Sequence, residues 1–218
     1  MKKIVTLIIA IVTLCGCEKN NIGLKVNSQE VIMYSLDEHV ITTDGTNVSF
    51  SSQNPYVAEV NETTGKITAR HIGETLIDVF ADQGTNQVKV TVWPKYNVIK
   101  DPFIEWGVSM SAIQKSCGAA DEINDGDLYY FYGDEKDGDK HIGTVYMLED
   151  DRLNGIMVIL NNKYYDDAAL HLAERFQYIG YEDGMYVYMD AMKEEDVKTI
   201  ISLFKTSGRW IVMYIPHK

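Results

Sequence analysis

The sequence predicts a multidomain protein: an N-terminal all-β sandwich followed by an α+β domain with a mixed sheet and about three helices. Residues 24–92 contain short alternating segments between turn signals and show no helical stripe. Trp93–Pro102 contains two prolines and no clear periodicity, and residues 103–218 then mix the strand and helix periods. We therefore expect domains at residues 24–92 and 103–218, joined by a linker at residues 93–102.

The N-terminus has the pattern of an export signal. A basic start, Met1–Lys3, precedes the apolar run Ile4–Leu14. A helix needs about 20 residues to span a bilayer, so this run is too short to span and is typical of a secretory signal peptide. The tetrad Leu14-Cys15-Gly16-Cys17 resembles the lipobox of bacterial lipoproteins. The resemblance implies lipid on Cys17, a signal peptide at residues 1–16 and a tether at residues 17–23; an ordinary cleaved signal is the alternative.

Charge and cysteine content limit the possible partners and the fold. The formal net charge is −12, most of it from residues 100–218. An acidic chain is a poor partner for nucleic acid or anionic lipid. After cleavage before Cys17, Cys117 would be the one remaining cysteine, so we expect no intrachain disulfide. The lipid would hold the protein in the cell envelope, at the outer membrane or cell surface rather than the inner membrane.

The first domain carries a family resemblance within Ser51–Val79. This stretch resembles the bacterial Ig-like domain of group 2, a module seen in invasin- and intimin-type surface proteins. The matching positions are Asn54-Pro55, Val57-Ala58, Val60, Thr64–Ala69, Gly73, Thr75 and Ile77. The resemblance implies an Ig-like sandwich that serves as an extracytoplasmic spacer or adhesion module without catalytic residues. Arg70 and His71 stand where the family usually has smaller residues.

The second domain shows no family resemblance, and its elements follow from periodicity. Strands are expected at Leu128–Gly133, His141–Leu148, Gly155–Leu160, Met185–Asp190 and Arg209–Ile215. A first helix is expected near Ser109–Cys117. A second is expected to begin at Asp166 and to carry one apolar stripe of Ala169, Leu172, Ala173, Phe176 and Ile179. A third is expected after Asp190, with Val197, Ile200, Ile201 and Phe204 facing inward.

Metal and cofactor signals are weak. None of His141, His171 and His217 has a second histidine or cysteine at ligand spacing, so we predict no cofactor and no metal site. The segment Gly133–His141 gathers acidic residues from Asp134 to Asp139. We favour a solvated hairpin tip there, because its spacing does not match a calcium-binding helix–loop–helix motif, and calcium binding is the open alternative.

Tyrosines suggest a binding surface. Most of the 14 tyrosines lie in the second half, and Tyr130 with Tyr132, and Tyr186 with Tyr188, are expected to share strand faces. Tyrosine suits contact with sugars or proteins, although it is also an ordinary sheet residue. We therefore expect a non-enzymatic, lipid-anchored adhesion or binding protein whose second domain binds a protein or glycan. The alternatives are an exported hydrolase with its site in the second domain and a structural subunit of an envelope complex.

Overall fold

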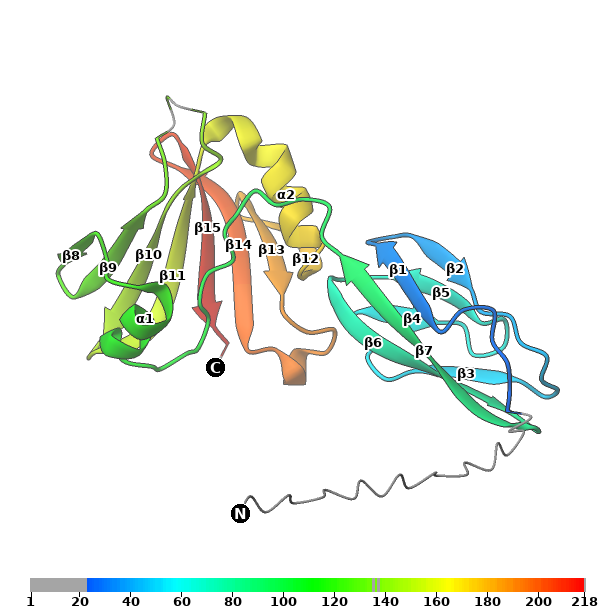
Figure 1. The fold of residues 1–218 in the computed structure, drawn as a ribbon. Helices are drawn as coiled ribbons and strands as arrows, with labels where there is room; N and C mark the ends of the chain where they lie inside the picture. The colour runs from blue at the N-terminus through cyan, green and yellow to red at the C-terminus, as the bar shows by residue number, and fades with distance from the viewer. Residues whose placement is uncertain (1–22, 135, 137, 218) are drawn as a thin grey trace, which may run out of the picture.

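The computed structural model describes residues 23–134, 136 and 138–217, which form two lobes (Figure 1). The expected signal peptide and Cys17 lie outside the described residues. No helix within the described residues has the length and apolar character needed to cross a membrane.

The first lobe is a sandwich of two sheets, as the sequence predicts. One sheet has the strand order β1-β7-β6-β3 and the other the order β2-β5-β4. Strands β1 and β7 pair in parallel, and the other pairs are antiparallel. Ile67, Ile77, Val79, Val88 and Val90 are fully buried between the sheets. The strands are β1 (Glu30–Tyr34), β2 (Glu38–Val40), β3 (Ser49–Ser52), β4 (Ala58–Val60), β5 (Lys66–Ala69), β6 (Gly73–Ala81) and β7 (Gly84–Trp93).

The second lobe is built on one eight-stranded sheet with the order β12-β13-β14-β15-β11-β10-β9-β8. All of its strand pairs are antiparallel, so the expected mixed sheet is wrong for this lobe. The strands are β8 (Glu122–Asn124), β9 (Asp127–Phe131), β10 (His141–Glu149), β11 (Arg152–Leu160), β12 (Gln177–Glu182), β13 (Met185–Met189), β14 (Thr199–Thr206) and β15 (Arg209–Pro216).

The expectation of three helices is also wrong. The described part of the chain has two α-helices, α1 (Met110–Cys117) and α2 (Tyr165–Ala173), together with short 3₁₀ turns at Asn162–Tyr164 and Glu194–Asp196. The third expected helix is strand β14, which pairs along its length with β15. Helix α2 ends at Ala173, before Phe176 and Ile179 of its expected stripe, and Ile179 lies in β12.

One face of the large sheet is covered. Helices α1 and α2 and residues 94–109, which we call the covering segment, lie on this face (Figure 1). Val98 and Ile99 of the covering segment join Ile113, Leu172 and sheet residues in a single core. Apolar side chains on this face are therefore removed from water by a layer of helix and extended chain.

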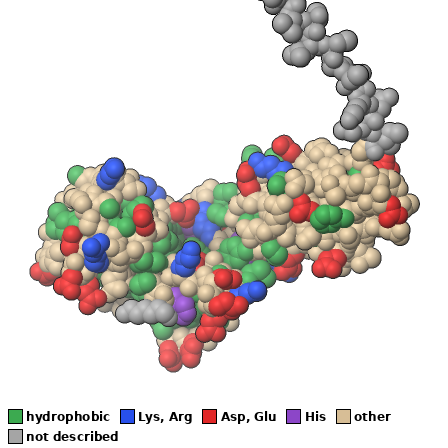
Figure 2. Space-filling model, turned by 90° about the horizontal axis from the view of Figure 1, so that it is seen from below, with side chains coloured by type: hydrophobic (Ala, Val, Ile, Leu, Met, Phe, Trp, Pro, Cys, Tyr) green, Lys and Arg blue, Asp and Glu red, His purple; other side chains and the backbone are tan. Residues whose placement is uncertain are grey.

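The lobes meet at a small junction. The Ile72 N–H donates to the Glu174 carbonyl (2.8 Å), and the Tyr56 hydroxyl donates to the Arg175 carbonyl (2.8 Å). The Tyr56 and His71 rings stack with their centroids 4.0 Å apart; His71 is buried and Tyr56 is half-buried. Figure 2 shows the two lobes from below, with hydrophobic side chains gathered near the place where they meet. His71, an unusual residue for its position in the resembled family, thus has a structural role at the junction.

Candidate binding site

The four tyrosines singled out from the sequence do not form one surface. Tyr130 and Tyr188 are 4% and 3% exposed and belong to the core of the second lobe. The Tyr130 hydroxyl donates to the Gly118 carbonyl at 2.9 Å. Neither side chain can face a partner, because each is buried in this core.

Tyr132 is exposed but lies just beyond the end of β9. Its ring meets the His141 ring edge-on at 4.7 Å, and the Lys100 ammonium lies 4.6 Å from its centroid. Tyr132 therefore lies apart from Tyr186, with its ring already in contact with a histidine and a cation.

Tyr186 belongs to a larger aromatic group, which we call the aromatic row: Trp210, Tyr165, Tyr186 and Tyr181. Trp210 and Tyr165 stack with centroids 4.0 Å apart. The ring centroid of Tyr165 lies 5.8 Å from that of Tyr186, and the Tyr186 centroid lies 4.8 Å from that of Tyr181. Tyr181 is 61% exposed and the other three rings are half-buried. The row therefore runs from rings that pack against the core of the second lobe, Trp210, Tyr165 and Tyr186, to the exposed ring of Tyr181, and is drawn from β15, α2, β13 and β12.

Strand register explains how β12 and β13 contribute to this surface. Tyr181 pairs with Tyr186, and Tyr178 pairs with Tyr188. A register shift between Tyr178 and Gly180 adds one residue to β12, so that Tyr178 and Tyr181 reach the same face although they are three apart. Strand β12 lies at the edge of the sheet, and its Tyr178 side chain is also exposed.

The Tyr165 hydroxyl stays protonated. Burial raises the pKa of Tyr165, and the hydrogen bond with Tyr186 and nearby charges, including that of Asp166, raise it further. A protonated phenol can both donate and accept a hydrogen bond. The row therefore offers apolar ring surface together with hydrogen-bonding groups, a combination suited to sugar or protein contacts.

Sequence reasoning missed Trp210, Tyr165 and Tyr181. The concentration of tyrosine in the second half was the available signal, but it did not distinguish exposed rings from buried ones. The break in the two-residue period at Ile179 hid the shared orientation of Tyr178 and Tyr181.

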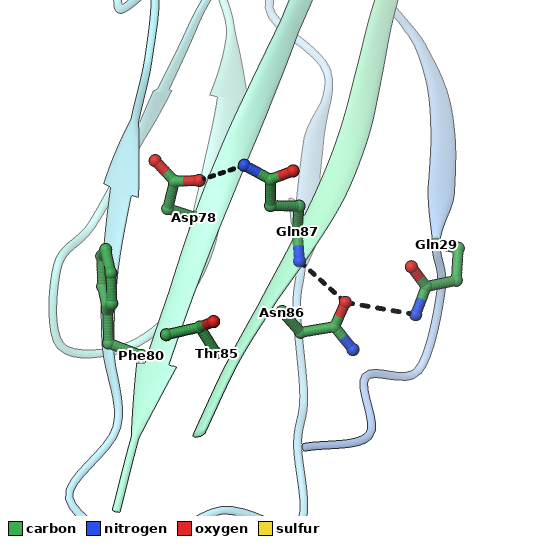
Figure 3. Close-up of a pocket in the computed structure, with 6 residues that line it drawn as sticks. All are labelled: Gln29, Asp78, Phe80, Thr85, Asn86 and Gln87. Atoms are coloured by element: carbon green, nitrogen blue, oxygen red, sulfur yellow. Dashed lines mark hydrogen bonds between the residues drawn. The ribbon is translucent and has the colours of Figure 1, made fainter. Parts of the chain in front are cut away.

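Two surface hollows are weaker candidates. A groove of about 680 Å³ lies at the junction of the lobes, between Asn54–Tyr56 and Asp190–Lys193, with Asp196 also lining it. The other hollow lies on the first lobe and is lined by Gln29, Asp78, Phe80, Thr85, Asn86 and Gln87 (Figure 3).

The polar groups in the hollow of Figure 3 bind one another. The Gln87 side-chain amide donates to Asp78 at 2.7 Å, and the Asn86 side-chain oxygen accepts from the Gln87 N–H at 2.7 Å. Groups already paired in this way gain little by exchanging their partners for those of a ligand.

Acidic and histidine residues form no metal site in the part of the chain that the structure describes. At the expected hairpin tip, the Asp134 carboxylate accepts from the Lys136 N–H (2.8 Å) and the Asp139 carboxylate from the Asp134 N–H (3.0 Å). His141 and His171 are buried and bond to neighbouring backbone atoms. These groups thus have structural partners.

The family comparison supports the resemblance found in the sequence. Residues 29–92 match the bacterial Ig-like domain (group 2). The first lobe is therefore a bacterial Ig-like domain, as expected, and the match leaves the second lobe without a family. No curated protein matches the chain.

Three solved structures resemble the chain weakly. An intimin mutant of EHEC O157:H7 has a TM-score of 0.30 and 12% identity, covering 88% of this chain and 98% of that chain. Domains 5–6 of the S-layer protein SbsC have a TM-score of 0.28 and 11% identity, and the match covers 89% of this chain and 83% of that chain. Domains 4–9 of surface layer protein SbsC have a TM-score of 0.27 and 11% identity, and the match covers 90% of this chain and 27% of that chain.

Proposed function

We propose that this is a lipid-anchored protein of the bacterial cell envelope, in which the Ig-like lobe is a spacer and the second lobe binds a protein or glycan. The observation that carries the proposal is the aromatic row, with its four neighbouring rings and the highly exposed Tyr181. Rigid aromatic side chains supply contact area at a low entropic cost, and tyrosine and tryptophan are enriched in binding surfaces.

The arrangement of the lobes supports the role of the first lobe as a spacer. The described chain enters the Ig-like lobe at the end that lies away from the second lobe (Figure 1). The point at which the described chain begins is therefore separated from the aromatic row by the length of the Ig-like lobe.

Lipid anchoring is tested by Cys17→Ala. We expect the variant to lose fatty-acid labelling and to move from the membrane fraction to the soluble fraction, because stable anchoring depends on the acyl chains. Cys15→Ala is the matched control and should remain labelled. Unchanged labelling of Cys17→Ala would remove this part of the proposal.

Partner binding is tested with the chain lacking residues 1–17, applied to a glycan array and to envelope extracts. For any ligand found, Tyr181→Ala/Tyr186→Ala should weaken binding by about 30-fold, the size expected of an aromatic hot spot worth ~2 kcal/mol. Tyr181→Ala, whose ring is mostly exposed, should weaken binding without changing the melting temperature.

Tyr34→Ala is the control, because Tyr34 is an exposed tyrosine of the first lobe. A ligand that binds the Tyr181 variants as tightly as the unmodified chain would place its site elsewhere. The absence of any ligand in both screens would favour the structural-subunit alternative.

A further inference from the structure

The large sheet ends in a strand whose outer edge is unpaired. Strand β12 is the last strand of this sheet and pairs with β13 alone within the described residues. It has six residues and is longer than any other terminal strand in the part of the chain that the structure describes. Strand β8, at the opposite edge, has three residues. A terminal strand presents backbone N–H and C=O groups that can pair with another chain.

Hairpin geometry turns the backbone of Tyr181 toward this edge. A two-residue turn, Asp183-Gly184, joins β12 to β13, and both of its residues have a positive φ. The residues that flank such a turn, here Glu182 and Met185, form a hydrogen-bonded pair, and bonded and non-bonded pairs alternate along an antiparallel ladder. The next pair is therefore non-bonded, so the N–H and C=O groups of Tyr181 point away from β13.

Strand β12 has few of the features that protect an edge from pairing. Such features include lysine, proline and β-bulges, and the sequence of β12 contains neither lysine nor proline. The bulge at Ile179 leaves Gly180–Glu182 in regular register with β13. Among the described residues, no atom outside the chain neighbours lies within 4 Å of the position that a Gly180 Cβ would take. The half of β12 next to the turn is therefore open to a further strand.

Exposed apolar side chains lie along the same edge. Tyr178 is 46% exposed, Ile179 49% and Tyr181 61%. The Tyr178 ring rests on that of Tyr188, with centroids 5.4 Å apart, as the Tyr181 ring rests on that of Tyr186. At ~150 to 250 Å² for each aromatic side chain, the two exposed tyrosines leave roughly 200 Å² in contact with water. A strand added beside β12 would cover this surface with its alternate side chains.

We propose that β12 receives an extended peptide of a partner protein, which adds to the large sheet as a further strand. This inference rests on the proposed binding function and names its partner as a protein rather than a glycan. In strand addition, main-chain hydrogen bonds supply affinity and side-chain contacts supply specificity. Alternate apolar residues of the peptide lie on Tyr178 and Tyr181. Glu182 and Asp183 are exposed at the turn, so a lysine or arginine at that end of the peptide complements their charge.

A glycan and a second copy of the chain fit this edge less well. A sugar can stack on the tyrosine rings, but it has no row of N–H and C=O groups to pair with those of Tyr181. The first lobe lies at the other end of β12, where the Tyr56 hydroxyl binds the Arg175 carbonyl. Antiparallel pairing of two copies would bring each Asp183 turn against the other copy's first lobe. A short peptide avoids this contact.

The inference is tested by selecting peptides of about nine residues, a typical strand length, from a displayed random library on the full chain in mild nonionic detergent. Selected peptides should alternate apolar residues and carry lysine or arginine at one end. The tightest peptide is then synthesised with alternate amides N-methylated, on one edge or on the other. Methylation of the edge that pairs with β12 should weaken binding by about 30-fold, the loss expected from two or three hydrogen bonds, and methylation of the outer edge should not.

Two measurements on the protein locate the bound peptide. Amide exchange followed by NMR should slow at the Tyr181 N–H when the unmethylated peptide is bound, because that group gains an acceptor. Ile179→Pro, at a bulge where a sheet tolerates proline, should weaken binding by about 10-fold or more, because proline obstructs pairing at an edge. Ile123→Pro, on the opposite edge of the sheet at a 53% exposed position, is the matched control and should bind normally. Circular dichroism melts check that both variants fold.

The methylated peptides decide the question on the unmodified protein if Ile179→Pro does not fold. Recovery of no peptide overturns the inference, as do peptides that tolerate methylation of either edge and leave the Tyr181 N–H unprotected. A glycan that loses affinity for Tyr181→Ala, again without protecting this N–H, overturns the inference while the proposed binding function stands. A chain that dimerises at roughly 100 µM with the Tyr181 N–H protected overturns it in favour of a second copy.

Discussion

His141 is a buried histidine held in one neutral form by its neighbours. Its Nδ1 accepts a hydrogen bond from the Lys100 N–H (3.0 Å), so its proton lies on Nε2, which is 3.1 Å from the Gly143 carbonyl. Burial lowers the pKa of His141 to about 4, although the bond to Gly143 opposes the shift. The side chain joins the covering segment to strand β10, so its protonation bears on stability rather than on binding.

We expect stability to fall as pH falls from about 6.5 to about 4. In that range the unfolded chain binds a proton at His141 that the folded chain does not, so lower pH favours unfolding. The shift corresponds to an upper limit of roughly 3 kcal/mol. Urea unfolding of the protein and of His141→Asn over this range measures the effect, and the variant should show a shallower fall.

His217→Asn is the control for this measurement, since its partly exposed ring lies near the chain end. If His141→Asn and His217→Asn lose stability with pH as steeply as the unmodified protein, His141 is not the source of the pH dependence.

Strand β14 shows why an apolar segment can be assigned to the wrong element. Val197, Ile200, Ile201 and Phe204 fit a helical stripe, but Thr199, Ile201 and Leu203 also fit a strand that is buried on alternate residues. Periodicity cannot separate the two when both sides of the segment are apolar. Pairing with β13 and β15 decides in favour of the strand, because it satisfies the backbone groups along this segment.

The strand assignment predicts unequal effects at neighbouring positions. Leu203 is fully buried in the core, and Leu203→Ala should cost ~2 to 5 kcal/mol. Ile200 alternates with the buried Thr199 and Ile201 and is itself half-buried on the opposite side of the sheet, so Ile200→Ala should cost clearly less. Chemical denaturation of both variants measures the difference. Equal losses, or a larger loss at Ile200, would contradict the assignment of the two faces.

At the scale of the whole molecule, Glu174 and Arg175 connect three parts of the structure. The Glu174 carboxylate accepts from the N–H groups of Lys95 (3.1 Å) and Tyr96 (2.9 Å), while its carbonyl accepts from Ile72 of the first lobe. The Arg175 Nε donates to Asp101 at 3.0 Å. Residues 95–101, within the segment expected as a linker, are therefore anchored to the second lobe.

Removing this anchor should expose the segment to protease. Val98 and Ile99, which lie between Lys95 and Lys100, are buried. Because buried backbone resists nicking, we expect a lysine-specific protease to cleave the native protein slowly here. Glu174→Ala leaves two N–H groups without their acceptor and should speed cleavage at Lys95 and Lys100. Mass spectrometry of timed digests locates the cuts.

Glu194→Ala, an exposed acid far from the covering segment in sequence, is the control and should be cleaved as slowly as the unmodified protein. Rapid cleavage of the native chain at Lys95 would show instead that residues 93–102 behave as an exposed linker, and the anchor would then have little effect.

Much of the fold could be predicted because local patterns reflect burial directly. Alternating Val88, Val90 and Val92 mark a strand with one buried side, and the structure places all three in the first core. The candidate site was harder to predict from the sequence. Of the four chosen tyrosines, only Tyr186 lies in the aromatic row, because alternation places Tyr186 and Tyr188 on one face but does not tell how deeply each ring is buried there.

By itself, the sequence determined the Ig-like character of the first lobe, five of the eight strands of the second lobe and helices near Met110–Cys117 and Tyr165–Ala173. These features depend on contacts within a short stretch, so a short stretch is enough to recognise them. The tertiary structure alone decided that β14 is a strand, that Tyr130 and Tyr188 are buried, and that Trp210 meets Tyr165. Each of these outcomes depends on partners far away in the chain, and strand pairing and burial bring those partners together only when the whole sheet forms.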